Sequence, residues 1–176
     1  MDIAAIIISS LALILSAFTF YWLNLREVKK FYLIRIDKTP NMKPEFALVN
    51  GGIKDILITK LECGFEDPDG NGVMYPSQRI EINENDSLLL QAGRSFHCKV
   101  SFPEKFTSRF VEGGELVTNS NPPIYSRKMR INIQWVEQNG DSYEKATHIS
   151  KYGFRENGDI CMHSPLQSKY DLYEKP

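Results

Sequence analysis

A predominantly apolar stretch over residues 3–23, interrupted only by three Ser and one Thr as strongly polar residues, opens the chain, and a long region of alternating apolar and polar residues follows it. The stretch contains no charged residue, and as an α-helix it would be roughly 30 Å long, about the thickness of the hydrocarbon core of a bilayer. Tyr21 and Trp22 stand near its end, and aromatic side chains favour the interface between lipid and water. The pattern predicts a transmembrane anchor over residues 1–25 and a basic juxtamembrane linker over residues 26–30.

The charges around this stretch bear on its type and orientation. A cleaved signal peptide has basic residues before a shorter apolar core, whereas here Arg26, Lys29 and Lys30 come after it. Lys and Arg near a span favour the cytoplasmic side. We therefore expect a single-pass protein of the inner (plasma) membrane with its C-terminal domain in the cytoplasm. The opposite orientation stays open, because a short N-terminus can insert either way.

Period-two alternation dominates from residue 31 onward and is clearest over residues 96–102 and 129–135. Such a pattern indicates strands with one buried and one solvent-facing side. About seven short strands separated by turn signals predict an antiparallel β-sandwich over residues 31–162, with a C-terminal tail over residues 163–176. Residues 103–112 could form a helical turn or two. Residues 113–126, rich in Asn and Pro, are expected to form a long loop.

The pair Asn139-Gly140 is a strong hairpin signal between two of these strands, and Asn157-Gly158 is a weaker one. A two-residue type I′ turn at Asn139-Gly140 would place Trp135 opposite Glu144. The same register would set Ile133 opposite Ala146, Ile131 opposite His148 and Gln134 opposite Lys145. The row Met129, Ile131, Ile133 and Trp135 is expected to face the core.

Two stretches, FALVNGGIKDILITKLECGF and SLLLQAGRSFHCKVSF, resemble the immunoglobulin-like sandwich modules of bacterial proteins. In those modules an Asn-x-Gly turn leads into an apolar strand, and a Gly precedes a later alternating strand, as Gly93 does here. The resemblance implies a fold and no functional residues. The expected architecture is thus one transmembrane helix followed by an all-β, immunoglobulin-like antiparallel sandwich.

Composition narrows the function classes. The chain has 21 Lys and Arg against 22 Asp and Glu, so no net positive charge draws it to nucleic acid. Its three cysteines include no C-x-x-C pair, which argues against a disulfide framework and fits a reducing compartment. A bridge between Cys63 and Cys98 stays open if the domain faces outward.

One acidic loop resembles the first half of a calcium-binding loop. Asp67, Asp69 and Asn71 stand at alternate positions before Gly72. The twelfth position is Gln78, where such a site needs a bidentate Glu. We interpret the stretch as a strand-connecting loop, with a weak cation site as the alternative. For the chain as a whole we expect no cofactor.

Catalytic signals are missing from the sequence. Cys161 and His163 could provide two metal ligands, but a tetrahedral site needs more. His97 is expected on a surface, and His148 is expected in the core or in a half-buried position. No G-x-S-x-G elbow and no glycine-rich phosphate loop occur in the sequence, so we expect no enzyme.

The apolar stretch carries a stripe of small residues at spacings of 4, 3, 4 and 3: Ala5, Ser9, Ala12, Ser16 and Thr19. Small residues let helices approach closely in lipid, so the stripe predicts a helix contact. We therefore expect a membrane-anchored interaction or accessory module that binds a protein partner, with residues 113–126 as a contact surface. The alternatives are an extracytoplasmic sandwich that binds a ligand or cell-envelope component and a small membrane-bound enzyme.

Overall fold

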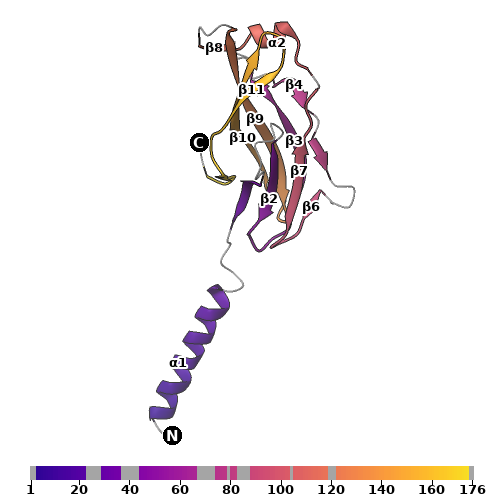
Figure 1. Cartoon of the computed structure of the whole chain (residues 1–176). Coiled ribbons are helices and arrows are strands. Elements are labelled where there is room, and N and C mark those ends of the chain that lie inside the picture. Colours follow the sequence, from indigo (N-terminus) through magenta and orange to yellow (C-terminus); the bar gives the residue numbers. More distant parts are fainter. Residues whose placement is uncertain are drawn as a thin grey trace.

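A helix projects from one end of a β-sheet domain in the computed structural model of the chain (Figure 1). The structure describes residues 3–22, 29–36, 44–66, 74–78, 80–82, 88–103, 105–118 and 122–174. Helix α1 (Ile3–Phe20) forms because its run of Ile, Leu, Ala and Phe contains neither Pro nor Gly. Helix α2 (Ser108–Glu112) is a single short element within the β domain.

The prediction of a membrane anchor is wrong. Among the residues that the structure describes, no helix is both long and apolar enough to cross a membrane. The 18 residues of α1 correspond to about 27 Å at the helical rise, which is less than the roughly 30 Å of a hydrocarbon core. The expectations of a single-pass inner-membrane protein and of a cytoplasmic C-terminal domain rested on that anchor and are withdrawn with it.

The first sheet contains five described strands in the order β12-β1-β2-β7-β5. Its pairings are antiparallel. The strand bounds are β1 (Phe31–Arg35), β2 (Glu45–Asn50), β5 (Ile80–Ile82), β7 (Ser95–Val100) and β12 (Lys169–Asp171). Strand β12 lies in the stretch that the sequence had suggested as a tail. It brings the C-terminal residues beside β1, close to the segment that follows α1.

The second sheet contains seven described strands, five of them in the order β11-β10-β9-β3-β4, with β6 paired to β3 and β8 paired to β9. Its strands are β3 (Ile56–Glu66), β4 (Met74–Gln78), β6 (Leu89–Leu90), β8 (Glu115–Thr118), β9 (Ile124–Glu137), β10 (Ser142–Arg155) and β11 (Ile160–Pro165). Strands β9 and β10 are the longest, and their pairing extends over almost their whole length.

The immunoglobulin-like assignment is not supported. Immunoglobulin domains have about seven to nine strands divided between two sheets, whereas the described residues here form sheets of five and seven strands. The domain is mostly β-sheet but includes the short helix α2, so it is not all-β as predicted. The expected loop over residues 113–126 is also wrong in part, because Glu115–Thr118 form β8 and Ile124 already belongs to β9.

The hairpin between β9 and β10 exists, but its register differs by one residue from the prediction. Trp135 lies opposite Tyr143 and Ile133 opposite Lys145. The loop has three residues, because Gly140 N–H donates to Glu137 O and Glu137 N–H donates to Asp141 O. Gly140 has φ +90°, and no described non-glycine residue has positive φ. A type I′ turn needs positive φ at both central residues, so Asn139 excludes it.

The second predicted hairpin, between β10 and β11, repeats the same loop. Gly158 has φ +85°, its N–H donates to Arg155 O, and Arg155 N–H donates to Asp159 O. In both loops the Asn side chain bonds to the Asp two residues later. The sequence Asn-Gly-Asp thus specifies a three-residue loop with a glycine in the left-handed region.

Aromatic side chains join the two sheets. Phe31 of β1 meets Trp135 of β9 edge to face, with ring centroids 5.1 Å apart.

A second aromatic cluster surrounds Phe65, which is fully buried. Four aromatic neighbours lie with their ring centroids 5.3–5.6 Å from that of Phe65: Phe106, Phe110, Tyr152 and Phe154. The predicted core row of β9 is confirmed, since Met129, Ile131, Ile133 and Trp135 are each at most 1% exposed.

Helix α2 closes the end of the domain near Phe65. Thr107 caps it by accepting a hydrogen bond from Phe110 N–H at 3.3 Å. Beneath it the buried Arg127 donates from Nε to Phe110 O at 2.7 Å and from Nη1 to Glu66 O at 3.2 Å. These hydrogen bonds link α2 to β9 and β3, and they provide partners for the buried guanidinium of Arg127.

Candidate functional site

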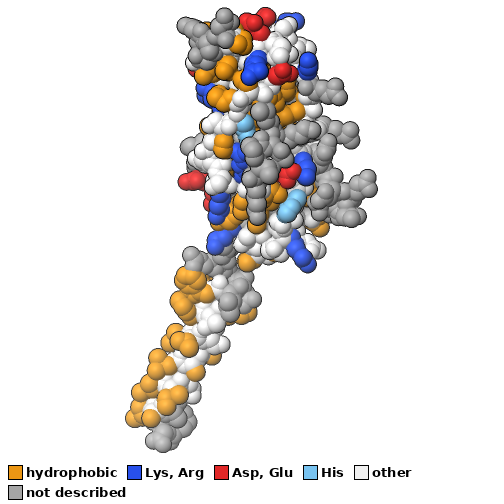
Figure 2. Space-filling model, in the orientation of Figure 1, with side chains coloured by type: hydrophobic (Ala, Val, Ile, Leu, Met, Phe, Trp, Pro, Cys, Tyr) orange, Lys and Arg blue, Asp and Glu red, His pale blue; other side chains and the backbone are white. Residues whose placement is uncertain are grey.

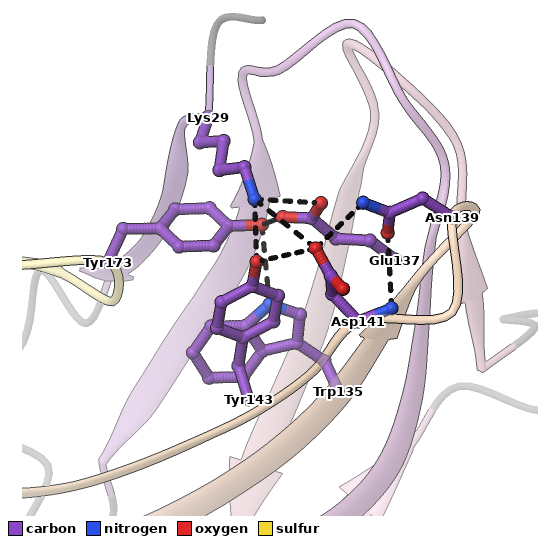
Figure 3. A network of polar contacts seen from close by, with 7 residues as sticks. All are labelled: Lys29, Trp135, Glu137, Asn139, Asp141, Tyr143 and Tyr173. Carbon is purple, nitrogen blue, oxygen red and sulfur yellow. Dashed lines mark hydrogen bonds and ion pairs between the residues drawn. The ribbon is translucent and has the colours of Figure 1, made fainter.

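A network of polar and aromatic side chains lies where the chain enters the β domain (Figure 3). Glu137 is the last residue of β9, Asp141 and Tyr143 lie where β10 begins, and Tyr173 follows β12. Lys29, just before β1, reaches into the middle of the group. Three segments that are distant in sequence thus meet at one place.

Glu137 is the buried acid of this network, with only 3% of its side chain exposed. Tyr173 donates a hydrogen bond to its Oε1 at 2.5 Å. Lys29 Nζ lies 3.2 Å from Oε2, which forms no hydrogen bond of its own, so this contact is an ion pair. Because a buried carboxylate is costly unless it is compensated, Lys29 and Tyr173 are what allow an acid at this core position.

Three aromatic rings pack together in this network, and two of them, Tyr143 and Tyr173, contact the lysine. Trp135 and Tyr143 stack with centroids 5.5 Å apart, and Tyr173 meets both edge to face. Lys29 Nζ lies 4.9 Å from the Tyr143 ring centroid and donates to the Tyr143 hydroxyl at 2.6 Å. Trp135 Nε1–H donates to the Tyr173 hydroxyl at 3.3 Å. The ammonium is therefore held by two hydroxylated rings and by the Glu137 carboxylate.

The protonation states follow from these contacts. The hydrogen bond to Tyr143, and next the Glu137 carboxylate, raise the pKa of Lys29 well above its usual value. Burial, reinforced by the bond to Glu137, raises the pKa of Tyr173. At neutral pH Lys29 is a cation and Tyr173 is a neutral donor. Neither group is poised as a base or nucleophile, and their contacts with Glu137 anchor the chain to the domain.

A hollow adjoins this network. It has a volume of about 280 Å³, counting the space open to solvent, and lies between Lys29, Lys30, the turn at residues 52–54 and Glu137. A second hollow of about 250 Å³ lies between β1, β2 and β10 and includes Arg35 and Ser150 in its wall.

Beside the second hollow, His163 Nε2 lies 3.2 Å from Ser150 Oγ and 3.4 Å from Arg35 Nη2. A serine next to a histidine suggests nucleophilic catalysis. However, a guanidinium can only donate and is always charged, so it opposes the imidazolium that must form when the histidine takes the serine proton. The geometry does not favour a serine–histidine dyad.

The structure separates the other residues singled out in the sequence. His97 is exposed on β7, as predicted, and His148 is half-exposed with its Nε2 2.8 Å from Glu66 Oε2. Cys63 and Cys98 are buried free thiols, and burial raises the pKa of Cys63. Within the described part of the chain, no three His, Cys, Asp or Glu side chains gather as a metal site would require.

Two predicted sites remain without a test. Asp67, Asp69 and Asn71 lie outside the described residues. Ser9, Ala12, Ser16 and Thr19 lie on α1 and are exposed, and the side chain of Ala5 is outside the described part. Thr19 donates to Leu15 O at 2.8 Å within the helix, so its hydroxyl is already satisfied there.

Sequence reasoning missed the network around Lys29, although one signal was available. The inward-facing row of β9 continues by alternation from Trp135 to position 137, where the residue is an acid. An acid in a core row needs a buried partner. Nothing local identifies that partner, because Lys29 and Tyr173 are distant in the chain. Comparison with protein-family models, with curated proteins and with solved structures found no match for the chain.

Proposed function

We propose that the protein is a non-catalytic binding module and that α1 is the segment that its protein partner encloses. The observation that carries the proposal is the exposure of α1. Its ten large apolar side chains are between 47% (Ile6) and 75% (Ile3) exposed, and at about 100° per residue they surround the helix except along the stripe of small residues. Figure 2 shows hydrophobic side chains along α1. This apolar surface is much wider than the roughly 100° stripe by which a surface helix packs on a core, and so wide an apolar surface is normally buried.

The free energy gained by covering these side chains indicates how much of the helix a partner must contact. Full burial of one such side chain stabilises by about 1.5–3 kcal/mol, so covering its exposed half or more contributes about 1–2 kcal/mol. Association costs on the order of 4–15 kcal/mol in lost freedom and ordering. Three or four side chains on one side of α1 would contribute about 3–8 kcal/mol, which barely offsets that cost, whereas all ten would contribute about 10–20 kcal/mol, which is enough to exceed most of that range. The partner should therefore surround the helix with apolar surface.

The β domain holds the chain in place shortly after α1 ends. Lys29 is held by Glu137, Tyr143 and Tyr173, which clamps the chain to the end of the sheets nine residues after α1 ends. Because the chain is held at Lys29, α1 can take fewer positions relative to the domain, and this restriction reduces the ordering cost of binding.

A second contact is proposed at β8, within the stretch expected from the sequence to bind a partner. Leu116 and Val117 are 50% and 44% exposed on this short strand. Two neighbouring half-exposed apolar side chains on a rigid strand suit an accessory contact, but their area is too small to act alone.

The proposal is tested by isolating the full chain from its host with its associated proteins and quantifying them. The Leu13→Glu/Leu15→Glu variant should lose one protein that the native chain retains in fixed proportion. The control Leu166→Glu changes a side chain of similar exposure (48%) on the domain and should retain it, and Leu116→Glu should retain less. The same set of proteins with all variants, or recovery of the chain alone, would contradict the proposal.

A further inference from the structure

The two Asn-Gly-Asp loops of the domain have the same hydrogen bonds but different surroundings. Asn139 and Gly140 are exposed, and apart from the chain neighbours no described residue has a heavy atom within 4 Å of where a Cβ on Gly140 would lie. Gly158 of the second loop is buried. Its carbonyl oxygen accepts from Phe106 N–H at 3.3 Å, and the backbone of Phe106 fills the space beside its Cα. The first loop can therefore change its backbone conformation more easily than the second.

An asparagine followed by a glycine is the sequence in which the backbone most readily attacks a side-chain amide. Asparagine is thermally labile, and glycine lacks the Cβ that would hinder the approach of its own amide nitrogen. The glycine nitrogen loses its proton to hydroxide and bonds to Cγ of the asparagine. The bond from Cγ to Nδ2 breaks, and Nδ2 leaves as ammonia after taking a proton from water. Water then opens the succinimide ring and gives aspartate or isoaspartate.

The folded loops must open before this ring can form. In both of them the glycine N–H donates to a backbone oxygen, that of Glu137 or of Arg155, at 2.9 Å. The asparagine side chain is bonded to the aspartate two residues later. These shared bonds slow the two sites alike. Opening of the second loop also breaks the bond from Phe106, which is 6% exposed in the aromatic cluster. One additional hydrogen bond corresponds to a roughly tenfold lower rate.

We propose that Asn139 is a site of spontaneous deamidation and that the packing of the second loop protects Asn157. The consequence falls on the network around Lys29 (Figure 3). Asn139 Nδ2 donates to Asp141 Oδ2 at 2.8 Å. The same oxygen accepts from the Tyr143 hydroxyl at 3.3 Å and lies 3.9 Å from Lys29 Nζ. Deamidation replaces the donor at position 139 by a second carboxylate. Because like charges repel, the two carboxylates separate, and Asp141 loses its place in the network.

Isoaspartate has the larger effect, because it adds one carbon atom to the backbone of a three-residue loop. The bonds from Gly140 N–H to Glu137 O and from Glu137 N–H to Asp141 O cannot both keep their geometry in the longer loop. The end of the hairpin between β9 and β10 is therefore weakened. Loss of one such bond should lower the melting temperature by about 2–4 °C.

The test is incubation of the full chain at mildly alkaline pH in a nonionic detergent, followed by digestion with trypsin. Cleavage after Lys and Arg leaves the two loops on separate peptides, residues 131–145 and 156–169. Liquid chromatography with fragmentation in the mass spectrometer quantifies aspartate and isoaspartate at each asparagine. Asn139 should convert roughly tenfold faster than Asn157 in the folded chain. In urea, where neither loop is folded, the two rates should be similar.

The control variant Asn139→Gln keeps the side-chain amide but would need a six-membered ring, which closes far more slowly. After incubation the native chain should show a second population that melts at lower temperature, and the variant should not. Equal rates at Asn139 and Asn157 in the folded chain, or no conversion of Asn139, would overturn the proposal. Converted native molecules that melt as before, or an equal loss of stability in the incubated variant, would also overturn it.

Discussion

Changing Lys29 to methionine should destabilise the β domain, because the buried Glu137 carboxylate would lose the cation that compensates its charge. Methionine keeps the length of the side chain against Tyr143 but removes its charge. Breaking a fully buried ion pair by removing one partner costs about 3–5 kcal/mol. Because the Lys29 side chain is 33% exposed while that of Glu137 is 3% exposed, water screens part of the interaction. We expect a loss of about 1–3 kcal/mol.

The companion change Glu137→Gln gives the sharper test. Its amide oxygen still accepts the Tyr173 hydrogen bond and leaves no buried charge, so it should cost less than about 1 kcal/mol. In the Lys29→Met background the same change should restore stability, because it removes the carboxylate that lost its cation. The two effects are therefore not additive, as expected for residues in contact.

Urea unfolding followed by tryptophan fluorescence measures these differences. Trp135 stacks on Tyr143 in the network, and a Trp22→Phe background removes the other tryptophan of the chain. Each kcal/mol should also lower the melting temperature by about 2–4 °C for a domain of this size. The control Lys99→Met breaks an exposed pair with Glu45 and should cost at most about 1 kcal/mol. Equal losses for Lys29→Met and Lys99→Met, with no rescue by Glu137→Gln, would refute the reasoning.

Three further predictions concern the domain. Tyr173 has a raised pKa in the folded state, so the folded protein keeps the hydroxyl proton to higher pH than the unfolded chain does. The free energy of unfolding should therefore fall as the pH rises above about 10, the ordinary tyrosine value. Urea titrations over this range should show a shallower fall for Tyr173→Phe. Ile133→Ala should cost about 2–5 kcal/mol in thermal unfolding because Ile133 is fully buried, whereas the outward Gln134→Ala should change little. Gly158→Ala should cost more than Gly140→Ala in the same assay: both have positive φ, but only at position 158 would a Cβ collide with a backbone oxygen, that of Phe106.

The alternation of side chains predicted the strand faces correctly because burial of one face is a local property of a strand. The core row of β9 is the clearest example. Register was harder, since Asn-Gly fits both a two-residue type I′ turn and a three-residue loop with glycine third. The bonds from Asn139 to Asp141 accompany the longer loop, and the Asp after Asn-Gly was the overlooked signal.

The candidate site depends on contacts that no local pattern encodes. Lys29 looked like part of a basic linker, yet it contacts Glu137 and Tyr173, which are more than a hundred residues away. Strand β12 brings Tyr173 there, and the sequence around it has no strong alternation. The apolar residues of α1 were recognised correctly as a group, but the same composition suggested a span that the described helix does not provide.

The most direct test of the central claim is photo-crosslinking from α1 in the full chain in its host. Residues 11–14 are consecutive in the helix, so they point in four directions about 100° apart. A photoreactive side chain placed at each of them in turn should crosslink to the same protein, and one at the exposed Glu144 of the domain should not. Crosslinks from a single direction, to other copies of this chain alone, or equally from Glu144 would contradict enclosure of α1 by a partner.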